Sequence, residues 1–274
     1  MPRRGLSWGV KYLWSGIAFL YLACAQAQNN QHENTTVISP ASSGARLAII
    51  IDDIGYNLPL GQRAIDLPGA ITYAILPHTP VAERLARQAI SSRSNKEIIV
   101  HMPMESQLGN KLGPGGLVAG LDKTEFLAAV RSALEHVPHA RGLSNHMGSY
   151  LTTLPSQMHW LMTELARQGY YYIDSKTVTN GQASAAAINS QVPYIARDIS
   201  RDHDPAPAAI QAAFNKAKRM ARQDGIAVII AHPYRSTLDF LEQQLPVLSR
   251  QGYTLVRASE AINYRQAAKQ LALQ

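Results

Sequence analysis

The chain has 274 residues, of which 46% are hydrophobic and 16% are charged, and its formal net charge is +7. A chain of this length and composition can bury a substantial core, as one α/β barrel or as two smaller domains, so extensive disorder is excluded. Part of the positive charge comes from Arg3, Arg4 and Lys11, and no basic stripe with interleaved aromatic residues follows. We therefore expect no nucleic-acid partner.

Residues 1–27 have the features of a signal peptide. Basic residues precede an apolar run over 12–25, and Ala25-Gln26-Ala27 has the small-x-small form of a cleavage site. The run is shorter than the ~20 residues that span a bilayer. We predict an exported, periplasmic protein without stable membrane insertion after cleavage, and an uncleaved N-terminal anchor is the alternative. Cleavage would remove Cys24, the only cysteine, and leave nitrogen and oxygen atoms as ligands of any metal.

Residues 28–45 are polar and aperiodic, which predicts a flexible spacer before one folded domain over 46–274. In this domain, aliphatic runs of strand length alternate with amphipathic stretches. The predicted strands span 47–52, 71–76, 97–102, 142–146, 170–174, 193–198, 226–232 and 253–258. The predicted helices start at Thr79-Pro80, after Asp122, at Pro155, at Ala208 and after Ser236. The fold class is therefore α/β, with a parallel sheet in a barrel or in a doubly wound arrangement.

Unusual polar residues recur at the carboxyl ends of the predicted strands. They are Asp52, Asp53, His78, His101, Asn145, His146, Asp174, Arg197, Asp198 and His232. In a parallel (β/α) barrel these ends meet on one face, where the active sites of such folds are built. The pattern predicts one polar site on that face.

The first of these motifs pairs two carboxylates. Asp52 and Asp53 would point to opposite sides of a regular strand, but at a strand end the backbone can turn both toward one centre. One carboxylate could then ligate a metal while the other accepts a proton; alternatively, the pair simply starts the turn at Gly55. His101 and Glu105 are separated by a segment containing a proline, which indicates a loop. Their nitrogen and oxygen atoms suit zinc, and a histidine–glutamate hydrogen bond is the alternative.

Two further histidines and their neighbours are candidates for the same site. Small polar residues surround His146, which favours a site role, whereas His232 follows a very apolar strand and could be a core histidine. Asn145, Tyr150 and Tyr234 are candidate substrate-binding residues. The tyrosines could stack on sugar rings, or they could serve packing alone.

The segments LAIIIDDIGYN, EIIVHMPMES, GLSNHMGSYLT and IAHPYRST, which fall within residues 46–262, resemble the divergent polysaccharide deacetylases, relatives of the NodB-type carbohydrate esterases. The resemblance implies a distorted, NodB-like (β/α) barrel of about seven parallel strands. It also implies a divalent metal, usually zinc, that activates water to remove acetyl groups from a sugar. The expected substrate is a cell-envelope or extracellular polysaccharide. A different metal hydrolase and a non-catalytic glycan-binding or scaffolding protein are the alternatives.

The same resemblance assigns roles to individual residues. It implies that Asp52 is the general base, that Asp53 and His101 ligate the metal, and that His232 is the acid. The sequence departs from the family's HxxxH segment because Glu105 stands in place of the second histidine. We predict that His146 completes the metal set, with Glu105 as a fourth ligand or as a partner that orients a ligand. Asp174 is expected to orient a catalytic group.

Overall fold

The computed structural model describes residues 44–91, 95–200 and 206–273. The predicted signal peptide and nearly all of the predicted spacer lie outside these ranges. The first strand begins at Ala45, one residue before the predicted start of the domain. In the part of the chain that the structure describes, no helix is both long and apolar enough to cross a membrane.

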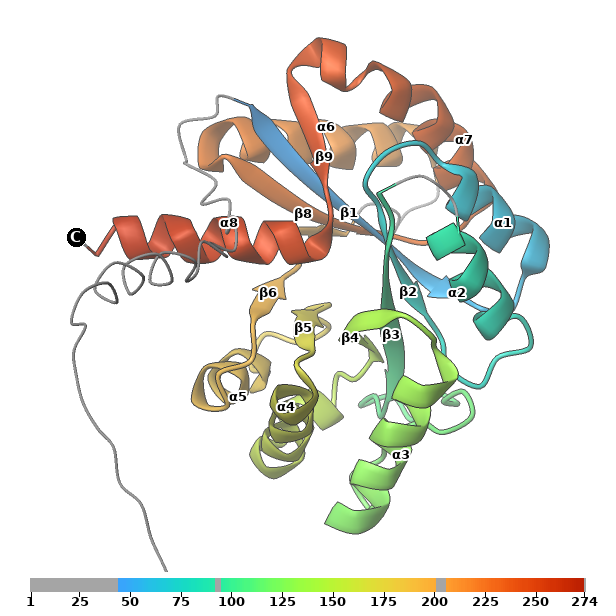
Figure 1. Ribbon diagram of the computed structural model, residues 1–274, viewed down its shortest axis with the longest axis vertical. Coiled ribbons are helices and arrows are strands. Elements are labelled where there is room, and N and C mark those ends of the chain that lie inside the picture. The colour runs from blue at the N-terminus through green and yellow to red at the C-terminus, as the bar shows by residue number, and fades with distance from the viewer. Residues whose placement is uncertain (1–43, 92–94, 201–205, 274) are drawn as a thin grey trace, which may run out of the picture. The chain divides into compact units, whose positions relative to one another are not determined.

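A single parallel sheet forms the centre of the domain (Figure 1). Its strands are β1 (Ala45–Ile54), β2 (Thr72–Ile75), β3 (Glu97–Met104), β4 (Ala140–Met147), β5 (Tyr171–Asp174), β6 (Tyr194–Ala196), β7 (Ile199–Ser200), β8 (Ile226–Ala231) and β9 (Tyr253–Val256). Seven of them follow one another in the order β6-β5-β4-β3-β2-β1-β8, and β7 adds a short ladder to β8. β9 pairs with the first half of β1, while β2 pairs with its second half. The predicted distorted (β/α) barrel is confirmed.

Helices alternate with the strands (Figure 1). They are α1 (Leu58–Asp66), α2 (Ala82–Ser91), α3 (Lys123–His136), α4 (Pro155–Gln168), α5 (Ala183–Asn189), α6 (Pro207–Asp224), α7 (Arg235–Gln244) and α8 (Ala258–Leu271). Local chemistry sets several of their ends. Asp122 and Glu125 form a capping box at the start of α3, where a helix start was predicted, and Gly169 ends α4 in the left-handed conformation with φ of 73°.

The predicted strand 193–198 is shorter in the structure, where β6 covers only Tyr194–Ala196 and the next strand, β7, starts at Ile199. Arg197 and Asp198 lie between β6 and β7, which are at opposite ends of the strand order. The backbone N–H of Arg197 donates to the backbone carbonyl of Asp174 on β5, and that of Asp198 donates to the backbone carbonyl of Val228 on β8. This dipeptide therefore carries the chain from one edge of the sheet to the other. The polar pair that was expected at a strand end serves the closure of the curled sheet.

Apolar side chains fill the space between sheet and helices on both sides of the central strands. Residues 47–51 of β1 have no exposed surface, and all of β8 is buried. Strands buried on both faces are held rigidly by packing. The backbone that carries the polar side chains at the carboxyl ends of these strands is therefore rigid.

Candidate metal centre

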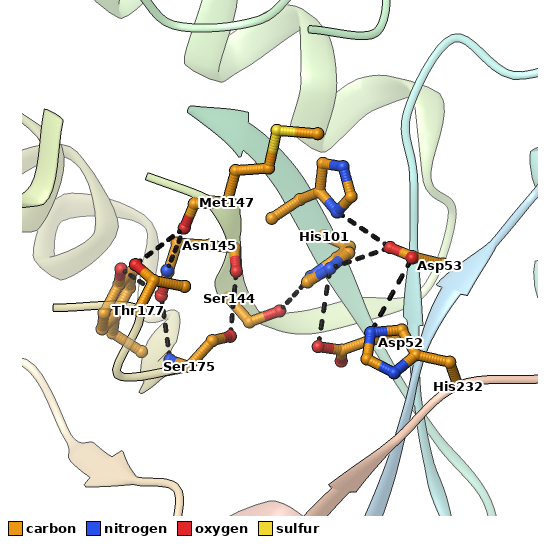
Figure 2. A network of polar contacts seen from close by, with 11 residues as sticks. Asp52, Asp53, His101, Ser144, Asn145, Met147, Ser175, Thr177 and His232 are labelled. Carbon is orange, nitrogen blue, oxygen red and sulfur yellow. Dashed lines mark hydrogen bonds and ion pairs between the residues drawn. The ribbon is translucent and has the colours of Figure 1, made fainter. Parts of the chain in front are cut away.

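A bulge in β1 turns two adjacent carboxylates toward one centre. Ile51 pairs with Tyr73 but Ile54 pairs with Ile75, so β1 contains one residue more than β2 over this stretch. Asp53 takes up the difference with φ of +58°, a left-handed conformation that is uncommon outside glycine. The alternation of a regular strand is broken here, and the carboxylates of Asp52 and Asp53 both face the imidazole of His101 (Figure 2).

Three histidines surround these carboxylates: His101 on β3, His146 on β4 and His232 directly after β8. His101 Nε2 is 3.3 Å from Asp53 Oδ1 and 3.5 Å from Asp52 Oδ2. His146 Nδ1 is 2.8 Å from Asp53 Oδ1, and His232 Nε2 is 3.8 Å from Asp53 Oδ2. The expected meeting of strand-end residues thus takes place for these side chains, with Asp53 at the centre (Figure 2).

The residues at this centre fit a divalent metal. Asp53, His101 and His146 each offer one ligand atom, and these atoms lie within 4.8 Å of one another. Asp53 Oδ1 is buried and has contacts to both imidazole nitrogens, but it has no partner with hydrogen-bond geometry among the described residues. An oxygen placed this way between two nitrogens suits a shared cation. Two imidazoles and a carboxylate are a usual donor set for zinc, with further positions left for water or substrate.

Burial affects the two carboxylates differently. Burial raises the pKa of Asp52, and the nearby His101 and His232 oppose this only in part. For Asp53, burial alone would also raise the pKa, but contacts with His101 and His146 outweigh it and the pKa is lowered. Asp53 therefore favours the ionised form that a metal ligand requires, whereas Asp52 has a greater affinity for a proton.

Ser144 was not predicted as a site residue, but its hydroxyl contacts the ring nitrogen of His101 that is not directed at the carboxylates. His101 and Ser144 are register partners on β3 and β4, and Ser144 Oγ is 2.7 Å from His101 Nδ1 (Figure 2). Both side chains are buried. Because Nδ1 is engaged by the hydroxyl, Nε2 faces the carboxylates. The alternation along β4, which gives Ser144 and His146 the same face, was the available signal.

Asn145, predicted as a substrate-binding residue, has instead a structural role. Its side chain has no exposed surface. Oδ1 accepts hydrogen bonds from Tyr172 Oη (3.1 Å) and from the Ser175 backbone N–H (2.9 Å), while Nδ2 donates to Met147 O (2.7 Å). Asn145 therefore ties the end of β4 to β5 and its following loop (Figure 2). This leaves no surface for a substrate, but it fixes the backbone on both sides of His146.

Two predicted acidic participants are not brought into the three-ligand cluster. Glu105 Oε2 accepts a hydrogen bond from the Ala119 backbone N–H (2.6 Å), so the carboxylate organises the loop before α3. Asp174 accepts hydrogen bonds from the Lys176 backbone N–H (2.7 Å) and from Tyr194 Oη (3.1 Å). Both carboxylates stabilise loops at the site face.

The remaining candidates lie around the cluster. The ring of Tyr234 stacks on that of His232, with centroids 5.6 Å apart and 22° between planes, and it is 48% exposed. Tyr150 is also exposed. His78, another strand-end residue, does not join the cluster; its ring lies against that of His136, with centroids 3.9 Å apart.

Comparisons with known proteins identify the family of the chain. The family model described as divergent polysaccharide deacetylase matches residues 49–262. The uncharacterized protein YibQ of Escherichia coli (strain K12) is 36% identical over 225 residues, which are 82% of this chain and 69% of YibQ.

Solved structures share the fold. The uncharacterized protein ATU2773 from Agrobacterium tumefaciens C58 aligns with a TM-score of 0.75 at 20% identity, over 81% of this chain and 90% of that one. The T48 deacetylase, solved with substrate, aligns with a TM-score of 0.51 at 13% identity, over 84% of this chain and 94% of that one.

Proposed function

We propose that this chain, which belongs to the divergent polysaccharide deacetylase family, is a metal-dependent hydrolase that removes acetyl groups from a cell-envelope or extracellular polysaccharide. The observation that carries the proposal is the cluster of Asp53, His101 and His146 beside the buried Asp52. Export by the predicted signal peptide would place the enzyme in the periplasm, where such a substrate is available.

Each side chain has a role that its position supports. Asp53, His101 and His146 would hold a divalent ion, zinc being the expected one, which supplies Lewis acidity and lowers the pKa of water. Asp52, with its raised pKa, accepts the proton of the attacking water. His232 reaches the centre from β8 and donates a proton to the leaving nitrogen or oxygen atom, while the ring of Tyr234 supports it.

A non-catalytic glycan-binding protein is the second candidate. Tyr56, Tyr150 and Tyr234 expose their rings at the ends of β1, β4 and β8, where sugar rings could stack on them. Glycan binding of this kind would need neither Asp52 nor a metal. One experiment can therefore distinguish a deacetylase from a glycan-binding protein.

The experiment measures acetate release from N-acetylated and O-acetylated glycans by the zinc-loaded full chain. We expect release by the wild type and a loss of about 10²- to 10⁴-fold in Asp52→Asn, which removes a general base. Asp52→Asn should still bind zinc, because Asp52 is not one of the three ligand residues. Glycan binding without acetate release from any of these substrates would favour the binding protein instead.

A further inference from the structure

A cavity of about 180 Å³ lies directly beside the candidate metal centre. Its walls come from three loops at the carboxyl ends of β1, β2 and β3, and His146 closes it on the side of the cluster. The lining residues are Tyr56, Leu76, Pro77, Thr79, Pro103, Lys111, Leu112, Gly113 and His146. Because His146 belongs to both, a glycan whose acetyl group meets the cluster would place a neighbouring substituent in this cavity.

The cavity is larger than an acetyl group requires. One water molecule takes about 30 Å³ of liquid volume, so this space accommodates a substituent of several non-hydrogen atoms. At Gly113, which lines the cavity, a Cβ atom would lie 3.3 Å from Tyr56 Oη. The loop thus brings its backbone close to a tyrosine hydroxyl.

The polar groups of the cavity walls favour a negative charge. The hydroxyl of Thr79 donates to Leu76 O (2.8 Å) and is already engaged. Lys111 and Tyr56 are among the lining residues, and none of the lining residues is acidic. Glu105, the acid of the same loop, holds the Ala119 N–H and does not line the cavity. A carboxylate in this space would meet a cation without a competing anion in the walls.

We infer that this cavity binds a carboxylate-bearing substituent, with Lys111 as the residue that recognises it. The substrate would then be an acidic glycan. The inference rests on the proposed function for the position of the scissile acetyl group, but the binding of the carboxylate is a separate event that can be measured without turnover.

The test compares sugars that differ by one carboxylate. N-acetylmuramic acid differs from N-acetylglucosamine by a lactyl ether, and glucuronic acid differs from glucose by a C6 carboxylate in place of the hydroxymethyl group. Binding of each to the full chain is measured by NMR titration, with and without zinc, in the wild type, in Lys111→Gln and in Lys216→Gln. Lys216 is exposed on α6 and controls for the loss of one positive charge.

We expect at least one acidic sugar to bind about tenfold more tightly than its neutral partner, a difference of about 1.4 kcal/mol. Lys111→Gln should remove the preference and Lys216→Gln should keep it. The pair that shows the preference identifies which carboxylate the cavity accepts.

Equal binding within both pairs, or no binding of any of these sugars, would overturn the inference. So would a preference that depends on zinc and survives in Lys111→Gln, because the carboxylate would then be ligating the metal. Failure of the proposed function looks different, since the zinc-loaded chain would release no acetate whether or not the acidic sugar is preferred.

Discussion

Two groups of carboxylates in this domain have opposite surroundings. Glu164 on α4 is only 3% exposed, and its oxygens accept hydrogen bonds from Arg131, Arg167 and Gln168 at 2.6 to 3.3 Å. Asp52 and Asp53, at the end of β1, face histidines, and each has a buried oxygen without a hydrogen-bond partner among the described residues.

The difference separates a structural site from a functional one. Arginine is always charged and saturates a carboxylate with its fixed donors, so the environment of Glu164 is complete. Histidine can be neutral and offer a lone pair, which leaves Asp53 beside nitrogens that suit a shared cation. A buried polar atom without a partner costs about 1–3 kcal/mol, and a bound ligand offsets this cost. Buried polar atoms without hydrogen-bond partners on the site face therefore indicate a binding site.

The largest expected effect comes from the ligands themselves. His101→Ala and His146→Ala should each lower zinc affinity by more than about 100-fold, beyond the 10- to 100-fold typical of outer partners. Glu105→Gln and Glu164→Gln should leave the affinity close to that of the wild type. Competition with a chelator measures all of these variants. A large loss of zinc affinity in Glu105→Gln with none in His146→Ala would contradict this ligand set. Glu105, which stands in place of the family's second histidine, would then be a metal ligand instead of His146.

The next effect tests Ser144 as a positioning residue. Ser144→Ala should weaken zinc binding by about 10- to 100-fold, because His101 Nδ1 loses the contact that orients its ring. Ser144→Thr retains a hydroxyl and should recover part of the affinity. If the alanine variant binds zinc as tightly as the wild type while remaining equally stable, the hydroxyl does not position His101.

Glu164→Gln should act on stability alone. We expect a loss of about 1–2 kcal/mol in the free energy of unfolding, measured with urea, since hydrogen bonds to a buried charged group are weakened. Glu83→Gln is the matched control: its partner Arg87 forms an exposed pair, worth less than about 0.5 kcal/mol. Equal losses of unfolding free energy in the two variants would show that the burial of Glu164 does not add to stability.

The smallest effect is the pH dependence of the difference in unfolding free energy between the wild type and Glu164→Gln. Hydrogen bonds from Arg131 and Arg167 hold the pKa of Glu164 well below its usual range. A carboxylate with a lowered pKa stabilises the fold above the unfolded-state value of about 4.3 and loses this contribution as the pH falls. Wild type and Glu164→Gln should therefore differ at pH 7 and converge in acid. A difference that grows below pH 4 would have the wrong sign.

Much of the fold was predictable because local chemistry determines it. Continuous aliphatic runs marked the strands, and Asp122 and Pro155 marked helix starts that the structure confirms. The end of β6 at Ala196 and the crossing of the chain to β7 were not predictable, since they depend on contacts with both edges of the sheet.

The site shows the same division. Asp53, His101 and His146 were identified from strand ends and from a family resemblance. The contact of His101 with Ser144 depends on the register between β3 and β4, which no local pattern sets. The direction of Glu105 depends on the long loop that follows it, and the burial of Asn145 depends on Tyr172 and Ser175 from β5 and its loop.

The most direct test of the account is the metal content of the purified full chain, determined by elemental analysis for the wild type and for His146→Ala. The account predicts about one divalent transition-metal ion, zinc in the first instance, per wild-type chain and none in the variant. A folded wild-type chain that holds no metal, even after incubation with zinc, would contradict it.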